Sequence, residues 1–142
     1  MSREQILAAI PHRPPMLLID EVAQWEPERI ICQKVFRADE WFFHGHYPDF
    51  PLVPGVILCE AAMQAGAVLL SKHAQGEGVP VVGRLNDVKF KRMVRPGETV
   101  QIEATLDERM ADAFFLSAKV TCEGKLAVSL AFVVTLSKQA TT

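Results

Sequence analysis

Apolar residues follow two different patterns along the chain, and the change between them separates a helical part from a strand-forming part. From Pro54 to about Ala74, apolar side chains occupy nearly every position, which predicts a helix that is buried on nearly all sides. After Gly76 and Gly78, runs of strand-forming residues follow, most of them with alternating apolar and polar positions. These patterns predict an α+β fold in which an antiparallel sheet curls around one buried helix.

The second half of the chain is predicted to be strand throughout. Alternation is clearest around Val100, Ile102 and Ala104, which polar residues separate. Arg95–Glu98 and Glu123–Lys125 have turn compositions, and the second suits a tight hairpin. All four strands are expected to offer an apolar face to the helix. They span 79–91, 99–108, 114–122 and 126–136.

Shorter elements precede the helix. Ser2 and Gln5 have the spacing of a capping box, which predicts a short helix that Pro11 ends. The residues from His12 to Pro15 are predicted to form an extended linker. Two strands around a turn at Pro27–Glu28 come next, and then a loop whose length is typical of a functional segment. The helix spans 2–9, the strands 16–26 and 29–37, and the loop 39–54.

Length and composition fit one domain that covers residues 1–142. Hydrophobic residues make up 49% of the chain and charged residues 23%, the balance of an ordinary globular protein. The net charge of -2 argues against nucleic acid as a partner, because phosphate binding requires a basic face. The apolar run 56–70 is short for a membrane span and contains Glu60 and Gln64, so we expect no transmembrane segment.

Cysteine usage and the N-terminus indicate a cytoplasmic protein. Cys32, Cys59 and Cys122 are far apart and odd in number, and they form neither a metal-ligand spacing nor a disulfide framework. Residues 1–15 include an acidic side chain and lack the long apolar stretch of a secretory signal. We therefore expect a cytoplasmic protein whose cysteines are reduced core residues.

A histidine and a glutamate around the start of the long helix are the strongest candidates for chemistry. His46 lies in a loop stiffened by glycine and proline, and Glu60 lies one and a half turns into the helix. A carboxylate on an apolar helix is costly to bury unless it is paired, hydrogen-bonded or protonated. The backbone N–H groups of Gly55 and Val56, at the helix start, offer donors for an oxyanion. This combination suits proton abstraction next to a carbonyl, coupled to loss or gain of a β-substituent.

Neighbouring polar residues have plainer explanations, and Glu60 itself has one, as a structural carboxylate satisfied by a neighbour. Gln64 follows Glu60 by about one helical turn and is predicted to hold a neighbour by hydrogen bonds. Lone loop histidines such as His12 and His44 are more often structural than catalytic. Cys59 has no base at helical spacing beside it and is predicted to be a core residue.

Basic residues cluster in and after the first of the four downstream strands, in an otherwise slightly acidic protein. One explanation is a solvated strand edge that resists aggregation. The other is a docking surface for an acidic partner. The sequence leaves both open. This basic cluster comprises Arg84, Lys89, Lys91, Arg92 and Arg95.

Four blocks of sequence form a pattern that is far more specific than any one of them. In order, they are IPHRPPMLLID at 10–20, GHYPDFPLVPGV at 45–56, EAAMQ at 60–64 and KFKRMVRPGE at 89–98. They resemble the blocks L-P-H-R-x-P-[FM]-L-L-[VI]-D, G-H-F-P-x-x-P-x-M-P-G-V, E-A-x-A-Q and K-F-[RK]-R-P-V-x-P-G-D. These belong to the β-hydroxyacyl-acyl carrier protein dehydratases of bacterial type II fatty acid synthesis, of the FabZ type. The resemblance covers almost the whole chain.

The resemblance implies a hot-dog fold, in which a long sheet wraps a central helix. It also implies a homodimer with two active sites across its interface, where His46 of one subunit faces Glu60 of the other. Whether dimers assemble further into a hexamer, a trimer of dimers, stays open. Glu60 favours the FabZ type, which dehydrates without isomerising, because the related FabA-type dehydratase/isomerase has aspartate there.

The implied reaction is reversible dehydration of a (3R)-hydroxyacyl thioester to the trans-2-enoyl thioester. Acyl carrier protein is the implied partner, since it carries the acyl chain through phosphopantetheine, and the basic cluster is the candidate surface for docking it. The resemblance makes His46 the general base and protonated Glu60 the general acid. The resemblance also implies that the backbone N–H of Gly55 polarises the thioester carbonyl and that Gln64 holds Glu60 in place. No metal or redox cofactor is expected.

Departures from the family pattern leave substrate length and rate open rather than reaction type. Asp49 and Phe50 stand where the family has glycine and a basic residue, Val53 replaces a methionine and Met93 a proline. Two other functions also stay open. One is an acyl thioesterase of the same fold, which uses a carboxylate and a water without His46. The other is a non-catalytic module that binds acyl chains or acyl carrier protein.

Overall fold

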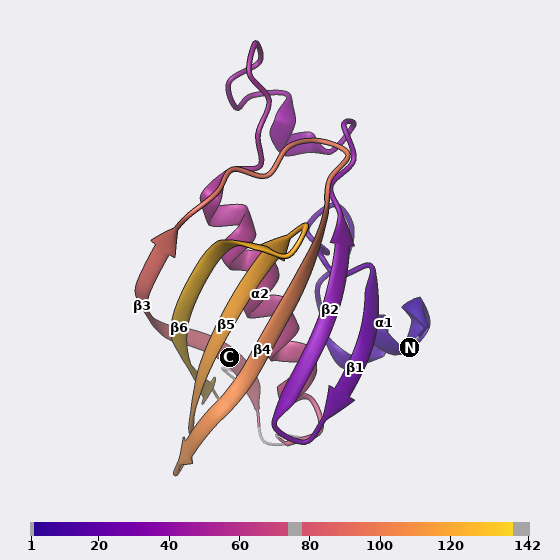
Figure 1. Ribbon diagram of the computed structural model, residues 1–142. Helices are drawn as coiled ribbons and strands as arrows, with labels where there is room; N and C mark the ends of the chain where they lie inside the picture. The colour runs from indigo at the N-terminus through magenta and orange to yellow at the C-terminus, as the bar shows by residue number, and fades with distance from the viewer. Residues whose placement is uncertain (1, 74–77, 138–142) are drawn as a thin grey trace, which may run out of the picture.

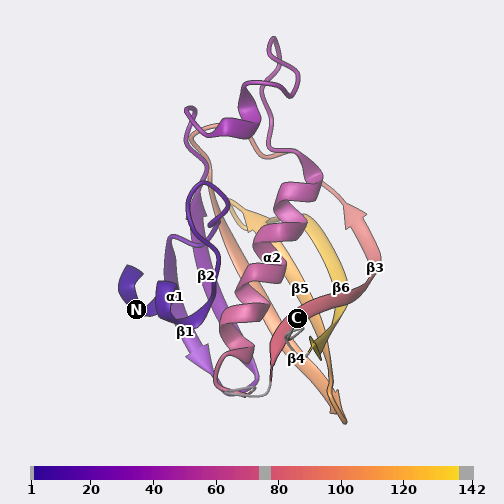
Figure 2. The ribbon, with the colours of Figure 1, turned by 180° about the vertical axis from the view of Figure 1, so that it is seen from behind.

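An antiparallel sheet of six strands wraps around one long helix in the computed structural model, which describes residues 2–73 and 78–137 (Figure 1). The helix, α2, lies behind the sheet in this view and in front of it when the molecule is turned round (Figure 2). The strand order is β1-β2-β4-β5-β6-β3, so β1 and β3 form the two edges. The predicted α+β architecture is confirmed. The elements are α1 (Arg3–Ala9), β1 (Glu21–Glu26), β2 (Arg29–Val35), a 3-10 helix η1 (Trp41–Phe43), α2 (Gly55–Leu70), β3 (Val79–Phe90), β4 (Thr99–Met110), β5 (Ala113–Cys122) and β6 (Lys125–Ser137).

Strands β4, β5 and β6 follow the predicted alternation of covered and open residues. Val100, Ile102 and Ala104 of β4 are fully buried, and the polar residues between them are not. β5 and β6 repeat this pattern and pair around a hairpin turn at Glu123–Gly124. Both turn residues have positive φ, 52° and 76°, which two-residue hairpin turns require. The predicted hairpin is therefore confirmed.

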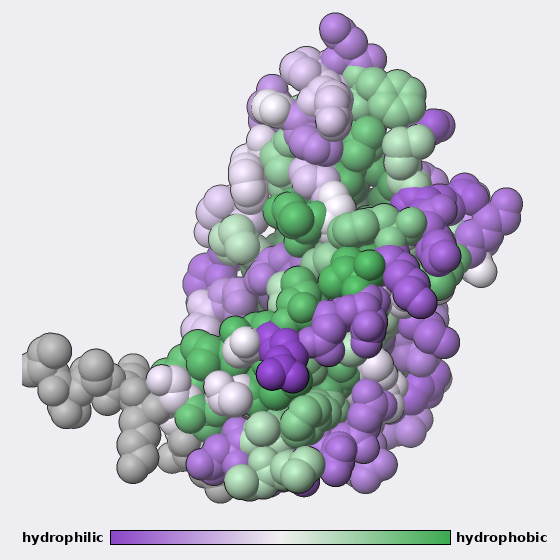
Figure 3. Space-filling model, turned by 90° about the vertical axis from the view of Figure 1, so that its left-hand side faces the viewer, coloured by the Kyte–Doolittle hydropathy of each residue, from purple (hydrophilic) through white to green (hydrophobic). Residues whose placement is uncertain are grey.

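Strand β3 corrects the prediction that all four downstream strands cover the helix. It lies at an edge of the sheet, and most of its residues are exposed, among them Val81, Val82 and Leu85, at 43–44% each. The helix packs instead mainly against β4, β5, β2 and β6. Figure 3 faces the β3 side of the molecule and shows hydrophobic surface bordered by hydrophilic surface. An edge strand of this kind offers both apolar side chains and unpaired backbone groups.

The chain up to the end of β2 confirms one prediction and corrects three. Ser2 and Gln5 form the predicted capping box at the start of α1. The extended linker is instead a turn, in which the Met16 N–H donates to the Arg13 carbonyl at 2.8 Å. The first strand begins at Glu21 rather than at Met16, because Leu18 and Met16 bond through their backbones to a side chain of α2, as described below. β2 likewise ends at Val35, two residues before its predicted end.

Helix α2 begins at the predicted residue and ends at Leu70, about four residues earlier than predicted. The Ser71 hydroxyl donates to the Val68 carbonyl at 2.7 Å and closes this end. Gly76, the predicted end signal, lies outside the described residues. Within residues 2–73 and 78–137, no helix has the length and apolar character that a membrane crossing requires.

One stripe of α2 is not covered by the rest of the chain, so the prediction of burial on nearly all sides is wrong for this face. Val56 is 71% exposed, and Glu60, Met63 and Ala67 are half-buried. Their spacing places them above one another on the helix. This open stripe (Val56, Glu60, Met63 and Ala67) is largely apolar and contains the candidate carboxylate.

Close approach of α2 to the sheet depends on Gly66. A Cβ at this position lies 2.8 Å from the ring of Phe132 and 3.2 Å from Leu116, both fully buried. An alanine Cβ at this distance overpacks the core at a cost of about 2–3 kcal/mol. Alanine gains roughly 1 kcal/mol in helix propensity. We therefore expect Gly66→Ala to lower the free energy of unfolding by a net amount of about 1–2 kcal/mol.

Chemical denaturation measures this change, with Gly45→Ala as the matched control. A Cβ on Gly45 meets no atom within 4 Å, so the control should unfold like the wild type. An unchanged free energy of unfolding for Gly66→Ala contradicts the tight contact.

Candidate active site

The carboxylate of Glu60 is held from two sides by groups of the same chain. Its oxygen Oε2 accepts a hydrogen bond from Gln64 Nε2 at 2.9 Å. The ring nitrogen Nε2 of His12 lies 3.6 Å from the same oxygen. The Glu60 side chain is 27% exposed, so it also faces outward along the open stripe. Among the described residues, no hydrogen bond or ion pair holds the other oxygen, Oε1, so the carboxylate is placed to exchange a proton there with a bound molecule.

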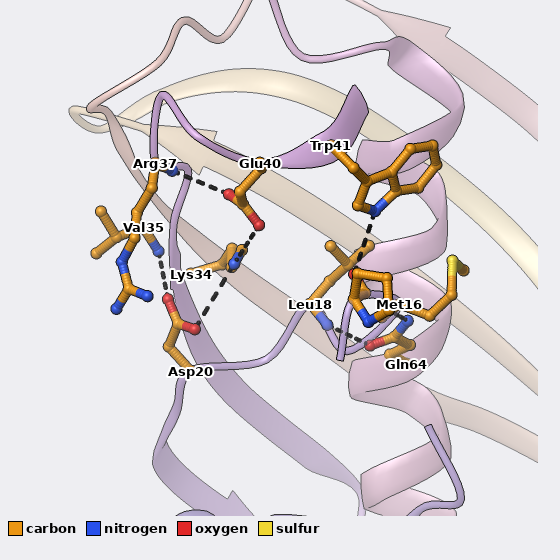
Figure 4. A network of polar contacts seen from close by, with 10 residues as sticks. Met16, Leu18, Asp20, Lys34, Val35, Arg37, Glu40, Trp41 and Gln64 are labelled. Atoms are coloured by element: carbon orange, nitrogen blue, oxygen red, sulfur yellow. Dashed lines mark hydrogen bonds and ion pairs between the residues drawn. The ribbon is translucent and has the colours of Figure 1, made fainter. Parts of the chain in front are cut away.

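Gln64 explains how a polar residue is tolerated inside the core. Its Oε1 accepts from the Leu18 N–H at 2.8 Å, and its Nε2 donates to the Met16 carbonyl at 2.8 Å as well as to Glu60. Figure 4 shows the amide facing these two backbone groups. Both N–H donors of the amide are therefore used, which is what burial of a polar group requires. The expectation that Gln64 holds a neighbour is confirmed in this geometry, and the neighbours are both Glu60 and the N-terminal segment.

His46 lies in the loop between η1 and α2 with a defined ring orientation. Its Nδ1 is 3.2 Å from the Leu52 carbonyl, and its ring packs edge-on against Tyr47 at 4.6 Å between centroids. A carbonyl accepts only, so this contact assigns the proton to Nδ1 and leaves Nε2 as the basic nitrogen. The ring borders a pocket of about 350 Å³, lined also by Trp41, Val56 and Ile57. His46 thus has the tautomer and the apolar surroundings that a general base needs.

A buried lysine, which the sequence reasoning missed, fastens the start of this loop. Lys34 is 6% exposed, and its Nζ lies 2.9 Å from Glu40 and 3.7 Å from Asp20 (Figure 4). The same carboxylates accept from the backbone N–H groups of Arg37 and Val35. The signal in the sequence was the register of β2, because Lys34 falls on the inward side that Ile30 and Cys32 occupy.

The rest of the loop is fastened at two further points. The Trp41 indole N–H donates to the Pro15 carbonyl at 3.2 Å, which joins η1 to the N-terminal segment. The Val53 N–H donates to the Val94 carbonyl at 2.7 Å, which fixes the chain just before α2. Between these points the loop projects beyond the end of the sheet (Figures 1 and 2).

The structure does not bring His46 and Glu60 together within one chain. Among the described residues, no hydrogen bond or ion pair joins their side chains, and the histidine that contacts Glu60 is His12. The plainer explanation given above for His12 as a structural residue is therefore incomplete. Its place in the sequence block 10–20 was the signal that could have marked it.

Gly55 and Val56 stand at the start of α2, as predicted. The first N–H to bond back is that of Ile57, which donates to the Pro54 carbonyl at 2.9 Å, so the N–H groups of Gly55 and Val56 precede the helical ladder. A Cβ on Gly55 lies 2.6 Å from the ring of Phe90. Only glycine therefore fits at this position while Phe90 keeps its place.

The basic cluster meets the same loop at Arg95. Arg84 and Lys89 belong to β3, and the other three residues follow it; all are exposed except the half-buried Arg92, which lies 3.9 Å from Glu123. The Arg95 guanidinium lies 5.5 Å from the centre of the Phe50 ring. Phe50 is one of the departures from the family pattern, and this cation–π contact gives it a partner.

The cysteines are free and buried, as predicted for core residues. Burial raises the pKa of Cys32 to about 12, and it raises the pKa of Cys59 as well. Burial and, next, the hydrogen bond to Glu98 raise the pKa of Cys122 to about 11. A thiol with a raised pKa is a poor nucleophile at neutral pH, which argues against Cys59 as a catalytic group. Among the described residues, no cluster of His, Cys, Asp and Glu is arranged to hold a metal ion.

A sequence model described as the FabA-like domain matches residues 10–131. The chain belongs to the FabA-like domain family. This FabA-like domain is 41% identical over 131 residues to an Oenococcus oeni protein named 3-hydroxyacyl-[acyl-carrier-protein] dehydratase FabZ, a match that covers 91% of this chain and 94% of that protein. A Staphylococcus carnosus protein of the same name is 39% identical over 127 residues, which is 88% of each chain. The expected kinship with the FabZ type is confirmed.

Solved structures confirm the hot-dog fold. A chain of the dehydratase heterocomplex ApeI:P from Xenorhabdus doucetiae aligns with a TM-score of 0.78 at 17% identity, covering 94% of this FabA-like domain and 91% of that chain. A hypothetical thioesterase from Streptococcus pneumoniae, solved with coenzyme A, aligns with a TM-score of 0.68 at 9% identity, covering 97% and 95%. At such identities the likeness extends to the fold alone.

Proposed function

We propose that this FabA-like domain is a 3-hydroxyacyl-[acyl-carrier-protein] dehydratase, which removes water from a (3R)-hydroxyacyl thioester to form the trans-2-enoyl thioester. The observation that carries the proposal is the Glu60 carboxylate, held at one oxygen by Gln64 and His12 on an otherwise apolar stripe. The near full-length identity to proteins of that name supports it. Buried, unpaired cysteines suit the reducing cytoplasm, where we place the reaction.

Two copies of the chain are needed to complete the site. The open stripe of α2 and the exposed valines of β3 are apolar surfaces that a second copy can cover. A partner whose β3 pairs with this β3 also satisfies the unpaired backbone groups of the edge. His46 does not contact Glu60 of its own chain. In the dimer it then shares an active site with Glu60 of the partner subunit. Native mass spectrometry of the intact protein tests the dimer and also shows whether three such dimers form a hexamer.

The proposed mechanism divides the proton transfers between the two subunits. His46 Nε2 removes the proton from C2, and electrons from that bond form the C2–C3 double bond. The C3–O bond breaks, and the hydroxyl leaves as water with a proton from Glu60 of the partner subunit. The Gly55 N–H at the start of α2 stabilises the negative charge on the thioester oxygen. Proton return from His46 to Glu60 restores the site, and no metal or redox cofactor takes part.

The partner that delivers the substrate is an acyl carrier protein, which presents the thioester on phosphopantetheine. The basic cluster supports this choice, because four of its five side chains are exposed and Arg95 contacts Phe50 of the loop that carries His46. An acidic carrier is attracted to such a surface.

A thioesterase is the second candidate, since some solved structures of this fold have that title. It requires no base at His46, and in this protein the His46 tautomer is fixed by the Leu52 carbonyl. A non-catalytic binding module requires neither His46 nor Glu60. The presence of both residues favours the dehydratase over either alternative.

The first test is hydration of crotonyl thioester, followed by loss of enoyl absorbance. We expect the wild type to hydrate it, and His46→Ala or Glu60→Gln to lower the rate by about 10²–10⁴, the usual contribution of a general acid or base. Thermal unfolding shows whether each variant is folded. Free thiol release without hydration identifies a thioesterase, and neither reaction, even with the thioester on carrier protein, identifies a binding module.

Subunit complementation tests the shared site. When His46→Ala and Glu60→Gln chains are mixed after unfolding and refolded together, each mixed dimer contains one site with both wild-type groups. Random pairing makes half of the dimers mixed, so we expect recovery of about a quarter of the wild-type rate. Each variant refolded alone is the control. No recovery, with mixed dimers present by native mass spectrometry, shows that each chain supplies both groups itself.

Charge reversal tests the basic cluster. We expect Lys89→Glu, Lys91→Glu and Arg92→Glu together to raise KM for the carrier-bound substrate by roughly tenfold or more, because charge complementarity speeds association. Hydration of a small crotonyl thioester should be unchanged. The matched control is Arg3→Glu, an exposed charge reversal on α1. If both substrates lose activity equally, the cluster is not the docking surface.

A further inference from the structure

In the part of the chain that the structure describes, His12 is a titratable side chain beside Glu60 that the mechanism leaves unused. Its Nε2 lies 3.6 Å from Glu60 Oε2, just beyond hydrogen-bond distance, and its side chain is 30% exposed. Its Nδ1 is buried and, among the described residues, has no hydrogen-bond partner. Catalytic hydrogen bonds are often long before substrate binds and shorten in the reacting complex.

We propose that His12 is a positioning residue that, with Gln64, binds the Oε2 of Glu60 and so assigns the transferred proton to Oε1. The proposal rests on the dehydratase function above and adds a residue to it. The groups that carry it are three side chains from two segments, Glu60 and Gln64 of α2 and His12 of the connection between α1 and β1.

Two nitrogen groups approach the same oxygen of Glu60. Gln64 Nε2 donates to Oε2 at 2.9 Å, and His12 Nε2 approaches that same oxygen. A protonated carboxyl group has one O–H donor and one carbonyl-like acceptor. Because an oxygen that faces two N–H donors must accept, the proton belongs on Oε1. Oε1 is therefore the atom that delivers it to the leaving hydroxyl.

The surroundings of the two ring nitrogens favour one tautomer of His12. A neutral imidazole has one N–H and one lone pair. A buried N–H without an acceptor is costly, so the proton is better placed on Nε2, opposite Glu60, than on the buried Nδ1. His12 then donates to the carboxylate as a neutral ring, and this donation strengthens as negative charge develops on Glu60.

The backbone around His12 is held in place, which matters because a donor positions its acceptor only when its own backbone is fixed. The Arg13 guanidinium donates to the His12 and Ile10 carbonyls, each at 2.8 Å, and to the Leu7 carbonyl at 2.9 Å. On the other side of His12, Gln64 holds the segment through Met16. The same amide thus fixes Glu60 directly and the chain that carries His12.

The expected effect on turnover follows from these contacts. Without the His12 donor, kcat should fall, because the Glu60 carboxylate is less well held while it exchanges its proton.

The test compares three replacements of His12 in the intact protein. We expect His12→Ala to lower kcat for crotonyl thioester hydration by about tenfold, below the 10²–10⁴ of a general acid itself, with little change in KM. His12→Gln places an amide N–H near the position of Nε2 and should restore kcat. His12→Asn reaches only the position of Nδ1 and should behave like His12→Ala.

Controls separate positioning from folding. Thermal unfolding and native mass must match the wild type, and His73→Gln, which replaces a histidine beyond the far end of α2, should keep the wild-type kcat. If His12→Ala does not fold, the contrast between the Gln and Asn variants still decides. Equal activity of those two variants, or an unchanged kcat in all three, overturns the proposal.

A second measurement distinguishes failure of this inference from failure of the proposed function. The side-chain carboxyl carbon of Glu60, labelled with ¹³C and identified by its loss in Glu60→Gln, reports hydrogen bonding to the carboxylate by NMR without turnover. At one fixed pH, its chemical shift should differ between His12→Ala and the wild type and return in His12→Gln. This result holds even if the wild type proves not to be a dehydratase. No difference between the variants removes His12 from the site.

Discussion

The buried amide of Gln64 is the interaction on which the rest of the site depends. It joins two backbone groups of the N-terminal segment to α2 and, with its remaining N–H, fixes Glu60. An unpaired amide at this depth costs free energy, so its partners must be in place when the chain folds. The sheet packs one side of the helix, and this amide, together with buried Ile10 and Leu18, brings the segment that contains His12 and Arg13 against the helix near Glu60. Stability and chemistry therefore use the same hydrogen bonds.

The loop that carries His46 is held by a different kind of contact. Lys34 is paired with two carboxylates inside the fold, and removal of either partner leaves a charge with less compensation. Trp41 and Val53 add hydrogen bonds on either side of the projecting part. In the dimer proposed above, a fixed start of the loop and a projecting tip are compatible, because the tip then meets another chain rather than its own helix.

Much of the fold could be predicted because local patterns and tertiary packing agree. The alternation in β4, β5 and β6 records one buried face, and the capping box at Ser2 is a purely local contact. The edge position of β3 could not be predicted, since its apolar residues look the same whether they face a core or another surface. The start of β1 was misplaced because a side chain, Gln64, bonds the backbone that a strand would otherwise pair. His12 was undervalued because only the fold brings it to Glu60.

The exposed valines of β3 have a consequence for the life of the chain in the cell. A single copy presents an apolar edge that can template pairing with any extended segment, which is the usual route to aggregation. Pairing with an identical copy removes that hazard and, in the arrangement proposed above, creates the site in the same event. Newly made chains are then inactive and prone to aggregation until they form dimers. When free chains are scarce, the amount of active protein therefore depends on the square of their concentration. Selection for activity and selection against aggregation act here on one strand.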